Sequence, residues 1–261
     1  QVAANLAAFE WGRRAAHDLQ AVLRQAAPAQ PISFNLPSAG RLSGAALDAF
    51  IARRRADLLA YQGRQLADRY VSWVRRIRAT ERHVRSPHGG LPLAGEPLTE
   101  AVARQLFRLM AVKDEYEVAR LLVSPEFESG LRNQFEGAWQ VAYHLSLPFM
   151  RDDSGRGRKV RLGSHWRPAL RLLSHLKFLR GSWFDPLGWT SERQAERAWL
   201  QRYEEGLSVI VAQLRLNNLD QALALARLPE QILGYGPIKQ ARMAEALPRW
   251  HQALNSFFQP S

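Results

Sequence analysis

Cysteine is absent from all 261 residues of the sequence. Disulfide bonds, thiol nucleophiles, thiolate zinc sites and cysteine-ligated iron–sulfur clusters are therefore excluded within this chain. The sequence also lacks a run of the roughly 18 consecutive apolar residues that a membrane-spanning helix needs, and its first residues do not resemble a signal peptide. We expect a cytoplasmic protein with no membrane partner, whose redox centre, if it serves one, lies outside these residues.

Lysine is scarce, because only four of the 36 basic residues are lysines, whereas arginines occur along every helical segment. The formal charge of +12 would suit an acidic or nucleic-acid partner. The aromatic residues lie on apolar stripes and are not interleaved with a basic patch, which argues against nucleic-acid binding. Apolar residues make up 46 % of the chain, and this is typical of a globular protein.

Apolar residues recur at spacings of three and four along most of the chain, so we predict a mainly α-helical fold. One small β-hairpin is expected where two short extended runs flank the acidic, glycine-rich stretch RDDSGRG at residues 151–157. The pattern divides the chain into a helix within residues 1–27, a linker rich in proline, glycine and serine at 28–44, and a helical domain at 45–261.

Local signals predict where the helices begin. An amphipathic helical segment runs from Leu47 to beyond Ile77. Thr99 is the expected N-cap of a helix whose apolar stripe continues to Val123. Ser191 opens a further helix with capping-box spacing, and Gly236 followed by proline is expected to start the final one.

The segment MAVKDEYEVARLLV, residues 110–123, places charged side chains inside a helical apolar pattern. On one continuous helix, Lys113, Glu117 and Arg120 would form a row beside Tyr116. Three interpretations stay open: a salt-bridged helix edge, an interdomain docking face, or a general acid or base. A docking face would comprise Lys113, Asp114, Glu115, Tyr116, Glu117 and Arg120. We also expect the row to meet the charged segment at residues 184–197.

Two further segments are weaker candidates for binding. In LGYGPIK, the backbone N–H groups of Gly234 and Gly236, with Lys239 one turn later, could hold a phosphate such as that of coenzyme A. The alternative is a simple turn that needs positive φ.

The tip of the predicted hairpin concentrates four basic residues, Arg156, Arg158, Lys159 and Arg161. They could contact an acidic partner, or they could protect a strand edge. The seven histidines are scattered without acidic or cysteine partners, so no metal site is predicted. No glycine-bracketed serine supports nucleophilic catalysis, and we predict no catalytic residue.

Four segments carry a family resemblance: AYQGRQLADRYVSWVRRIRATE, RLMAVKDEYEVARLLVSPEF, FDPLGWTSERQAERAWLQRYE and ARLPEQILGYGPIK. They resemble, in this order, the C-terminal region of the fused indolepyruvate ferredoxin oxidoreductases, which belong to the 2-oxoacid:ferredoxin oxidoreductase family. The likeness spans about residues 45 to 255. The opening NLAAFEWGRRAA is similar to the tail of the preceding α/β catalytic domain in those proteins.

This resemblance implies a parent enzyme that oxidatively decarboxylates arylpyruvates or related 2-oxoacids to acyl-coenzyme A. The family uses thiamine diphosphate, magnesium and iron–sulfur clusters and passes electrons to ferredoxin. This chain departs from the pattern, because it has neither the glycine-aspartate-glycine thiamine diphosphate motif nor the cluster cysteines. No catalytic residue or cofactor therefore carries over to it.

We accordingly expect a non-catalytic accessory domain, inactive when isolated, that begins with a helix left from an α/β catalytic domain. Its partners would be the rest of the parent polypeptide, itself a homo-oligomer, and ferredoxin, which the basic hairpin could contact. The alternative is an independent helical module that binds an acidic protein, coenzyme A or nucleic acid.

Overall fold

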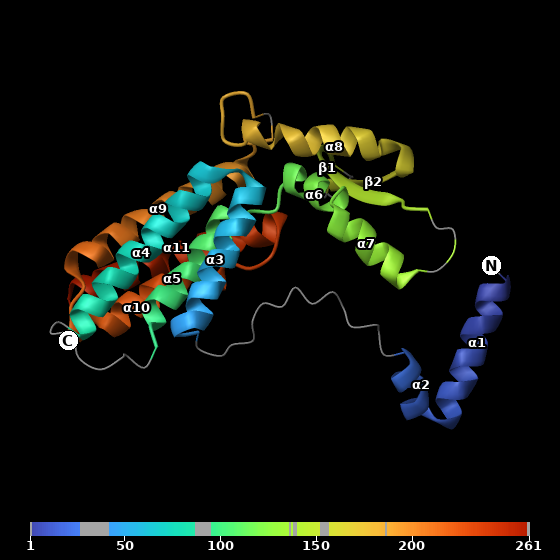
Figure 1. Ribbon diagram of the computed structural model, residues 1–261, viewed down its shortest axis with the longest axis horizontal. Helices are drawn as coiled ribbons and strands as arrows, with labels where there is room; N and C mark the ends of the chain where they lie inside the picture. Colours follow the sequence, from blue (N-terminus) through green and yellow to red (C-terminus); the bar gives the residue numbers. More distant parts are fainter. Residues whose placement is uncertain are drawn as a thin grey trace.

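The computed structural model describes residues 2–26, 42–86, 95–135, 137, 140–151, 157–185 and 187–259. Within this part of the chain it confirms a mainly α-helical fold with one small antiparallel β-hairpin (Figure 1). The helices are α1 (Val2–His17), α2 (Leu19–Ala26), α3 (Gly44–Tyr61), α4 (Arg64–Arg85), α5 (Pro97–Met110), α6 (Glu115–Leu122), α7 (Pro125–Gln134), α8 (Arg167–His175), α9 (Ser191–Gln213), α10 (Leu219–Arg227) and α11 (Gly236–Phe258). The strands are β1 (Tyr143–Arg151) and β2 (Gly157–Leu162).

The larger hydrophobic core lies among α3, α4, α5, α9, α10 and α11, which Figure 1 shows packed side by side. Tyr70 and Tyr203 are fully buried in it. Their hydroxyls donate to the backbone carbonyls of Ala103 (3.0 Å) and Ala226 (2.9 Å) respectively. Each phenol therefore adds apolar packing to the core without leaving its polar atom unsatisfied.

A smaller core joins α6 and α8 to the hairpin through Ala119, Tyr143 and Leu170. Tyr143 pairs with Leu162 across the two strands, and the register becomes irregular further along β1. The smaller core stands at one end of the larger bundle (Figure 1). The chain crosses between the two cores after α5 and again between α8 and α9, so these two crossings position the polar site described below.

The structure corrects the prediction of one helix from residue 99 to 123. That helix ends at Met110, and α6 begins only at Glu115. Asp114 caps α6, because its carboxylate accepts a hydrogen bond from the backbone N–H of Glu117 (2.8 Å). The apolar spacing continues on both sides of the break, which is why periodicity alone could not detect it.

Three other predicted boundaries also moved. Thr99 is no N-cap, because α5 begins at Pro97 and the threonine hydroxyl donates to buried Glu81 (2.6 Å). The amphipathic segment that starts at Leu47 is divided into α3 and α4 at Gly63, whose φ of +132° suits only glycine. The capping residue of α9 is Thr190, one position before the predicted Ser191.

The start of α11 at Gly236 is confirmed. The region 1–27 holds two helices instead of the one predicted, and the predicted linker lies almost wholly outside the described residues. Among the residues that the structure describes, no helix combines the length and apolarity that a membrane crossing requires.

Close packing of α9 on α11 predicts the effect of Gly206→Ala. A Cβ at Gly206 would lie 2.6 Å from the Trp250 ring, which is itself wedged against Trp199 and Tyr203 and cannot retreat. We expect a loss of about 1–3 kcal/mol in the free energy of unfolding, measured with urea. Gly12→Ala is the control, because a Cβ there meets nothing within 4 Å and should be neutral or stabilising. Equal losses in both variants would contradict the packing explanation.

Candidate functional site

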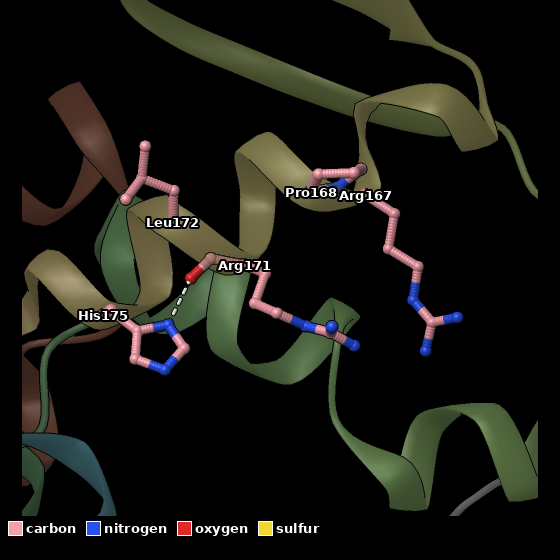
Figure 2. Close-up of a pocket in the computed structure, with 5 residues that line it drawn as sticks. All are labelled: Arg167, Pro168, Arg171, Leu172 and His175. Atoms are coloured by element: carbon pink, nitrogen blue, oxygen red, sulfur yellow. Dashed lines mark hydrogen bonds between the residues drawn. The ribbon is translucent and has the colours of Figure 1, made fainter.

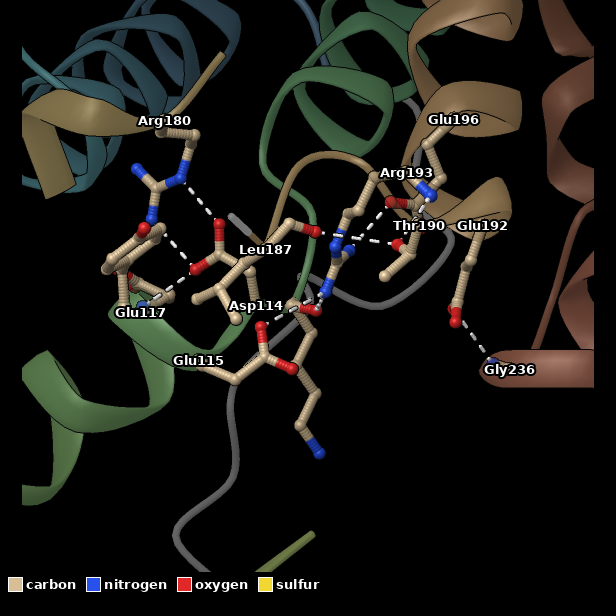
Figure 3. A network of polar contacts seen from close by, with 12 residues as sticks. Asp114, Glu115, Glu117, Arg180, Leu187, Thr190, Glu192, Arg193, Glu196 and Gly236 are labelled. Carbon is tan, nitrogen blue, oxygen red and sulfur yellow. Dashed lines mark hydrogen bonds and ion pairs between the residues drawn. The ribbon is translucent and has the colours of Figure 1, made fainter. Parts of the chain in front are cut away.

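A group of polar side chains, which we call the polar junction, lies where the two cores meet. Figure 3 shows four of its members, Asp114, Arg180, Arg193 and Glu196. Its members come from α3, the 111–114 break, α6, α9 and the segment between α8 and α9. They are Tyr61, Asp114, Tyr116, Arg180, Asp185, Arg193 and Glu196. Together with apolar neighbours they line a cavity of about 220 Å³, which is smaller than most ligand pockets.

Asp114 and Arg180 form a bidentate ion pair at the centre of the polar junction. The Arg180 Nε and Nη2 atoms donate to the two carboxylate oxygens at 2.5 Å and 2.8 Å, and the two side chains are 11 % and 5 % exposed. Arg180 also donates to the backbone carbonyl of Tyr61 (2.7 Å) and stacks on its ring, 3.7 Å from the centroid. One planar guanidinium thus links α3, the α6 cap and its own segment.

Tyr116 and Asp185 form a second link across the polar junction. The Tyr116 hydroxyl donates to Asp185 Oδ1 (3.1 Å), and the backbone N–H groups of Gly181 (2.9 Å) and Leu187 (3.2 Å) donate to the same carboxylate. Among the described residues Asp185 makes no ion pair, although it is only 3 % exposed. Burial and the neighbouring carboxylate raise the pKa of Tyr116 to about 12.

Arg193 and Glu196 connect α9 to the rest of the polar junction. Arg193 donates to Glu196 (2.7 Å) and to the backbone carbonyl of Lys113 (2.6 Å). Glu196 also binds Lys239 of α11 at 2.5 Å. Burial lowers the pKa of Arg193, but the neighbouring carboxylates of Glu196 and Glu115 raise it by more. The pKa of Arg193 therefore lies above its ordinary value.

The geometry of the polar junction suits a structural role, in which it holds the two cores together, better than it suits acid–base catalysis. Asp114, Asp185 and Glu196 already hold two or more donors each. Glu115 is the junction neighbour with the perturbed carboxyl: burial raises its pKa, and its nearest cation, Arg193, is 3.9 Å away. Glu115 does not line the cavity, however, so it has no substrate-sized space to serve. The three interpretations of residues 110–123 stay predictions: Glu117 and Arg120 form an ion pair along α6, and the other contacts join the two cores of this chain.

The predicted row of Lys113, Glu117 and Arg120 does not form. Lys113 lies in the break before α6, where its carbonyl accepts from Arg193 and its Nζ sits 4.8 Å from the centroid of the Tyr235 ring. Glu117 and Arg120 pair with each other within α6 at 2.6 Å and 2.8 Å. The segment 184–197 therefore contacts the Lys113 backbone and Tyr116. The break between α5 and α6 takes Lys113 out of helical register with Glu117 and Arg120.

Two of the three predicted donors of the candidate phosphate site are already engaged. The Gly236 N–H donates to Glu192 (3.1 Å), and Lys239 is bound to Glu196. The φ values of Gly234 and Gly236, +100° and +57°, fit the alternative of a turn that needs glycine. An anion would have to displace these carboxylates, so phosphate binding stays a prediction.

The basic hairpin is described only in part. Arg156 and the side chains of Arg158 and Lys159 lie outside the described residues, and Arg161 is exposed on β2. Contact with an acidic partner there stays a prediction.

The larger hollow, about 440 Å³, lies on α8 (Figure 2). Its lining residues all come from this one helix: Arg167, Pro168, Arg171, Leu172 and His175. Arg167 is held by Glu128 of α7 (2.5 Å), and the His175 ring contacts the Arg171 carbonyl (2.7 Å). A hollow with one wall cannot enclose a ligand, so we do not treat it as the functional site.

Five members of the polar junction were not among the predicted site residues: Tyr61, Arg180 and, from the charged segment 184–197, Asp185, Arg193 and Glu196. Tyr61 appeared as an apolar-stripe residue, and Arg180 as one of many scattered arginines. Asp185 had a usable signal, because aspartate before proline in a glycine-containing stretch favours a side-chain-braced turn. In the part of the chain that is described, no group of three or more histidine, aspartate or glutamate side chains is placed to hold a metal ion.

Comparison with protein families gives a match to most of the chain. The profile of a family of unknown function, DUF6537, matches residues 47–252. The chain belongs to the DUF6537 family. A search of curated proteins and a search of solved structures found no match. The DUF6537 match begins in α3 and ends in α11, so the family unit contains both cores and the polar junction between them.

The buried ion pair predicts strong energetic coupling between Asp114 and Arg180. Asp114→Ala should lower the free energy of unfolding by about 3–5 kcal/mol, because it leaves the Arg180 charge buried without its partner. The double variant with Arg180→Ala should lose less than the sum of the two single losses, by at least about 1 kcal/mol in urea unfolding. Arg242→Ala is the control: it breaks a pair that is 56 % exposed on both sides and should cost about 0–1 kcal/mol. Additive losses at Asp114 and Arg180 would contradict direct coupling.

The phenols predict a loss of stability in alkali. The pKa of Tyr116 is about 12 in the folded chain, and burial also raises those of Tyr61, Tyr70 and Tyr203. Between about pH 10 and 12 the unfolded chain ionises first, so rising pH favours unfolding by about 1.4 kcal/mol per pH unit for each such tyrosine.

Tyr116→Phe should therefore lose less stability than the parent chain between pH 9 and pH 11, measured by urea unfolding at each pH. Tyr235→Phe, whose ring is 68 % exposed, is the matched control and should follow the parent. A parallel pH dependence in all three proteins would show that the buried Tyr116 phenol does not set this slope.

Proposed function

We propose that this chain is a non-catalytic docking domain of a larger 2-oxoacid:ferredoxin oxidoreductase of the indolepyruvate type. Its parent would convert arylpyruvates or related 2-oxoacids to acyl-coenzyme A in the cytoplasm, with thiamine diphosphate, magnesium and iron–sulfur clusters held elsewhere. The proposal comes from the family resemblance of four segments. It is supported by where those segments lie in the fold.

The convergence of the four segments is the observation that carries the proposal. The first contributes Tyr61, the second Asp114 and Tyr116, and the fourth Lys239. The third supplies Asp185, which accepts from Tyr116, and Arg193 and Glu196, which bind the Lys113 carbonyl and Lys239. Segments from four separate parts of the chain thus resemble one family and also build one contiguous structure.

The chemistry of the polar junction fits an accessory role. Its carboxylates are held by arginine, lysine, phenol and backbone donors, and its cavity is small. Such an arrangement fixes the orientation of two cores and leaves no free acid and base facing a substrate. The competing proposal is an independent helical module that binds an acidic protein, coenzyme A or nucleic acid.

Deletion of residues 47–252 from the natural polypeptide that contains this chain tests the proposal. The intact polypeptide should reduce an electron acceptor in the presence of a 2-oxoacid and coenzyme A, and the deletion should lower turnover at least about tenfold by impairing assembly. The measurements are acceptor reduction and subunit association by analytical ultracentrifugation. Supplying the domain as a separate chain should restore part of the activity. Unchanged turnover together with unchanged association would defeat the proposal.

A further inference from the structure

Three large aromatic side chains project from the short segment between the 3₁₀ turn η2 (Leu176–Leu179) and α9. Trp183 is 83 % exposed, Phe184 77 % and Trp189 62 %, and we call them the aromatic triad. Single exposed apolar residues are ordinary on protein surfaces, but three large ones in one short segment are unusual. Figure 1 shows the segment looping outward beyond the ends of α8 and α9.

Hydrogen bonds on its inner side hold this segment in a defined shape. The Ser182 N–H donates to Leu179 O (2.8 Å), the Asp185 N–H to Ser182 O (3.2 Å) and the Gly188 N–H to Asp185 O (3.1 Å). The Asp185 carboxylate also binds the Gly181 N–H, as described above. The buried inner side faces the cavity of the polar junction, so the aromatic rings point away from a braced frame. Docking such preordered groups costs little conformational entropy.

The size of the aromatic triad matches the centre of an interface. An aromatic side chain presents about 150–250 Å² when fully accessible, so at these exposures the triad offers roughly 330–550 Å². This summed area is comparable to the area of the largest apolar patch on a typical monomer. It is about half of the area that one partner buries in a standard interface. Tryptophan and phenylalanine held by a stable frame are typical of the few residues that supply most of the binding energy.

The charges around the triad indicate the chemistry of its partner. Arg197 binds the segment itself and Lys177 lies in the turn just before it, and neither pairs with a carboxylate among the described residues. Lys177 donates to Ala60 O (2.5 Å) and Arg197 to Gly188 O (2.6 Å). Burial lowers the pKa of Lys177, with Arg120 and Arg180 adding to the effect and Glu117 opposing it. A second copy of a chain with a net charge of +12 would be repelled, and an acidic surface would be attracted.

We infer that the aromatic triad is the anchor by which this domain docks onto an apolar depression with an acidic rim on the catalytic part of its parent enzyme. This inference rests on the proposed function and identifies the surface through which the domain docks. The polar junction then has two linked roles. It holds the two cores together, and through Asp185 it holds the aromatic triad in its binding geometry.

Footprinting of the intact natural polypeptide tests the inference. Hydroxyl-radical oxidation read by mass spectrometry should modify Trp183 and Trp189 at least about fivefold more slowly than Trp166, although Trp166 is the least exposed of the three at 46 %. The variant Trp183→Ala, Phe184→Ala, Trp189→Ala in that polypeptide should lower 2-oxoacid turnover at least about tenfold. The matched control is Leu216→Ala, which removes a 69 % exposed side chain beyond the other end of α9 and should have no effect.

The outcomes separate this inference from the proposed function. Suppose that turnover requires residues 47–252, that Trp183 and Trp189 are oxidised fast, and that the triple variant keeps wild-type turnover. This result would overturn the inference and leave the proposed function standing. Protection of the triad in a polypeptide without 2-oxoacid turnover would overturn the proposed function while supporting the docking surface. Protection that is lost on dilution to monomers would assign the triad to a second copy, and protection only with anionic phospholipid vesicles would assign it to a lipid surface. Either result would overturn the inference.

Discussion

A buried ion pair between Asp114 and Arg180 is the interaction on which the rest of this structure depends. Asp114 caps α6 at the entrance to the smaller core, and Arg180 stacks on Tyr61 at the edge of the larger one. Two charges removed from water are tolerable only when both partners and their remaining hydrogen bonds are in place. The relative position of the two cores therefore depends on one arrangement of side chains, in which each guanidinium nitrogen of Arg180 donates to an acceptor.

The residues that follow Arg180 turn this arrangement into a surface. Gly181 and Leu187 direct their N–H groups at Asp185, which also receives the Tyr116 hydroxyl. The segment is thus polar and satisfied on its inner side and apolar on its outer side, which is the reverse of an ordinary surface loop. Polar groups that specify shape lie inside, and aromatic groups suited to an interface lie outside. A single short segment connects the polar junction to the proposed docking function.

The resemblance and the fold meet at the same place. The proposed family relationship rests on segments at residues 60–81, 108–127, 184–204 and 226–239, and each contributes a side chain to the polar junction or to its immediate partners. The DUF6537 match covers the same unit. A protein part that must hold two cores in register needs such residues at fixed places along the chain, even when it performs no chemistry of its own.

By itself the sequence determined the helical class, the hairpin, the start of α11 at Gly236 and the absence of thiol chemistry, because these depend on local spacing and residue type. The tertiary structure alone decided the break before Asp114 and the pairing of each charge. Periodicity reports which side of a helix is buried but not whether the helix is continuous. Arg180 lies 66 residues from Asp114, and any of the many arginines could have been its partner until folding brought this one to the cap of α6.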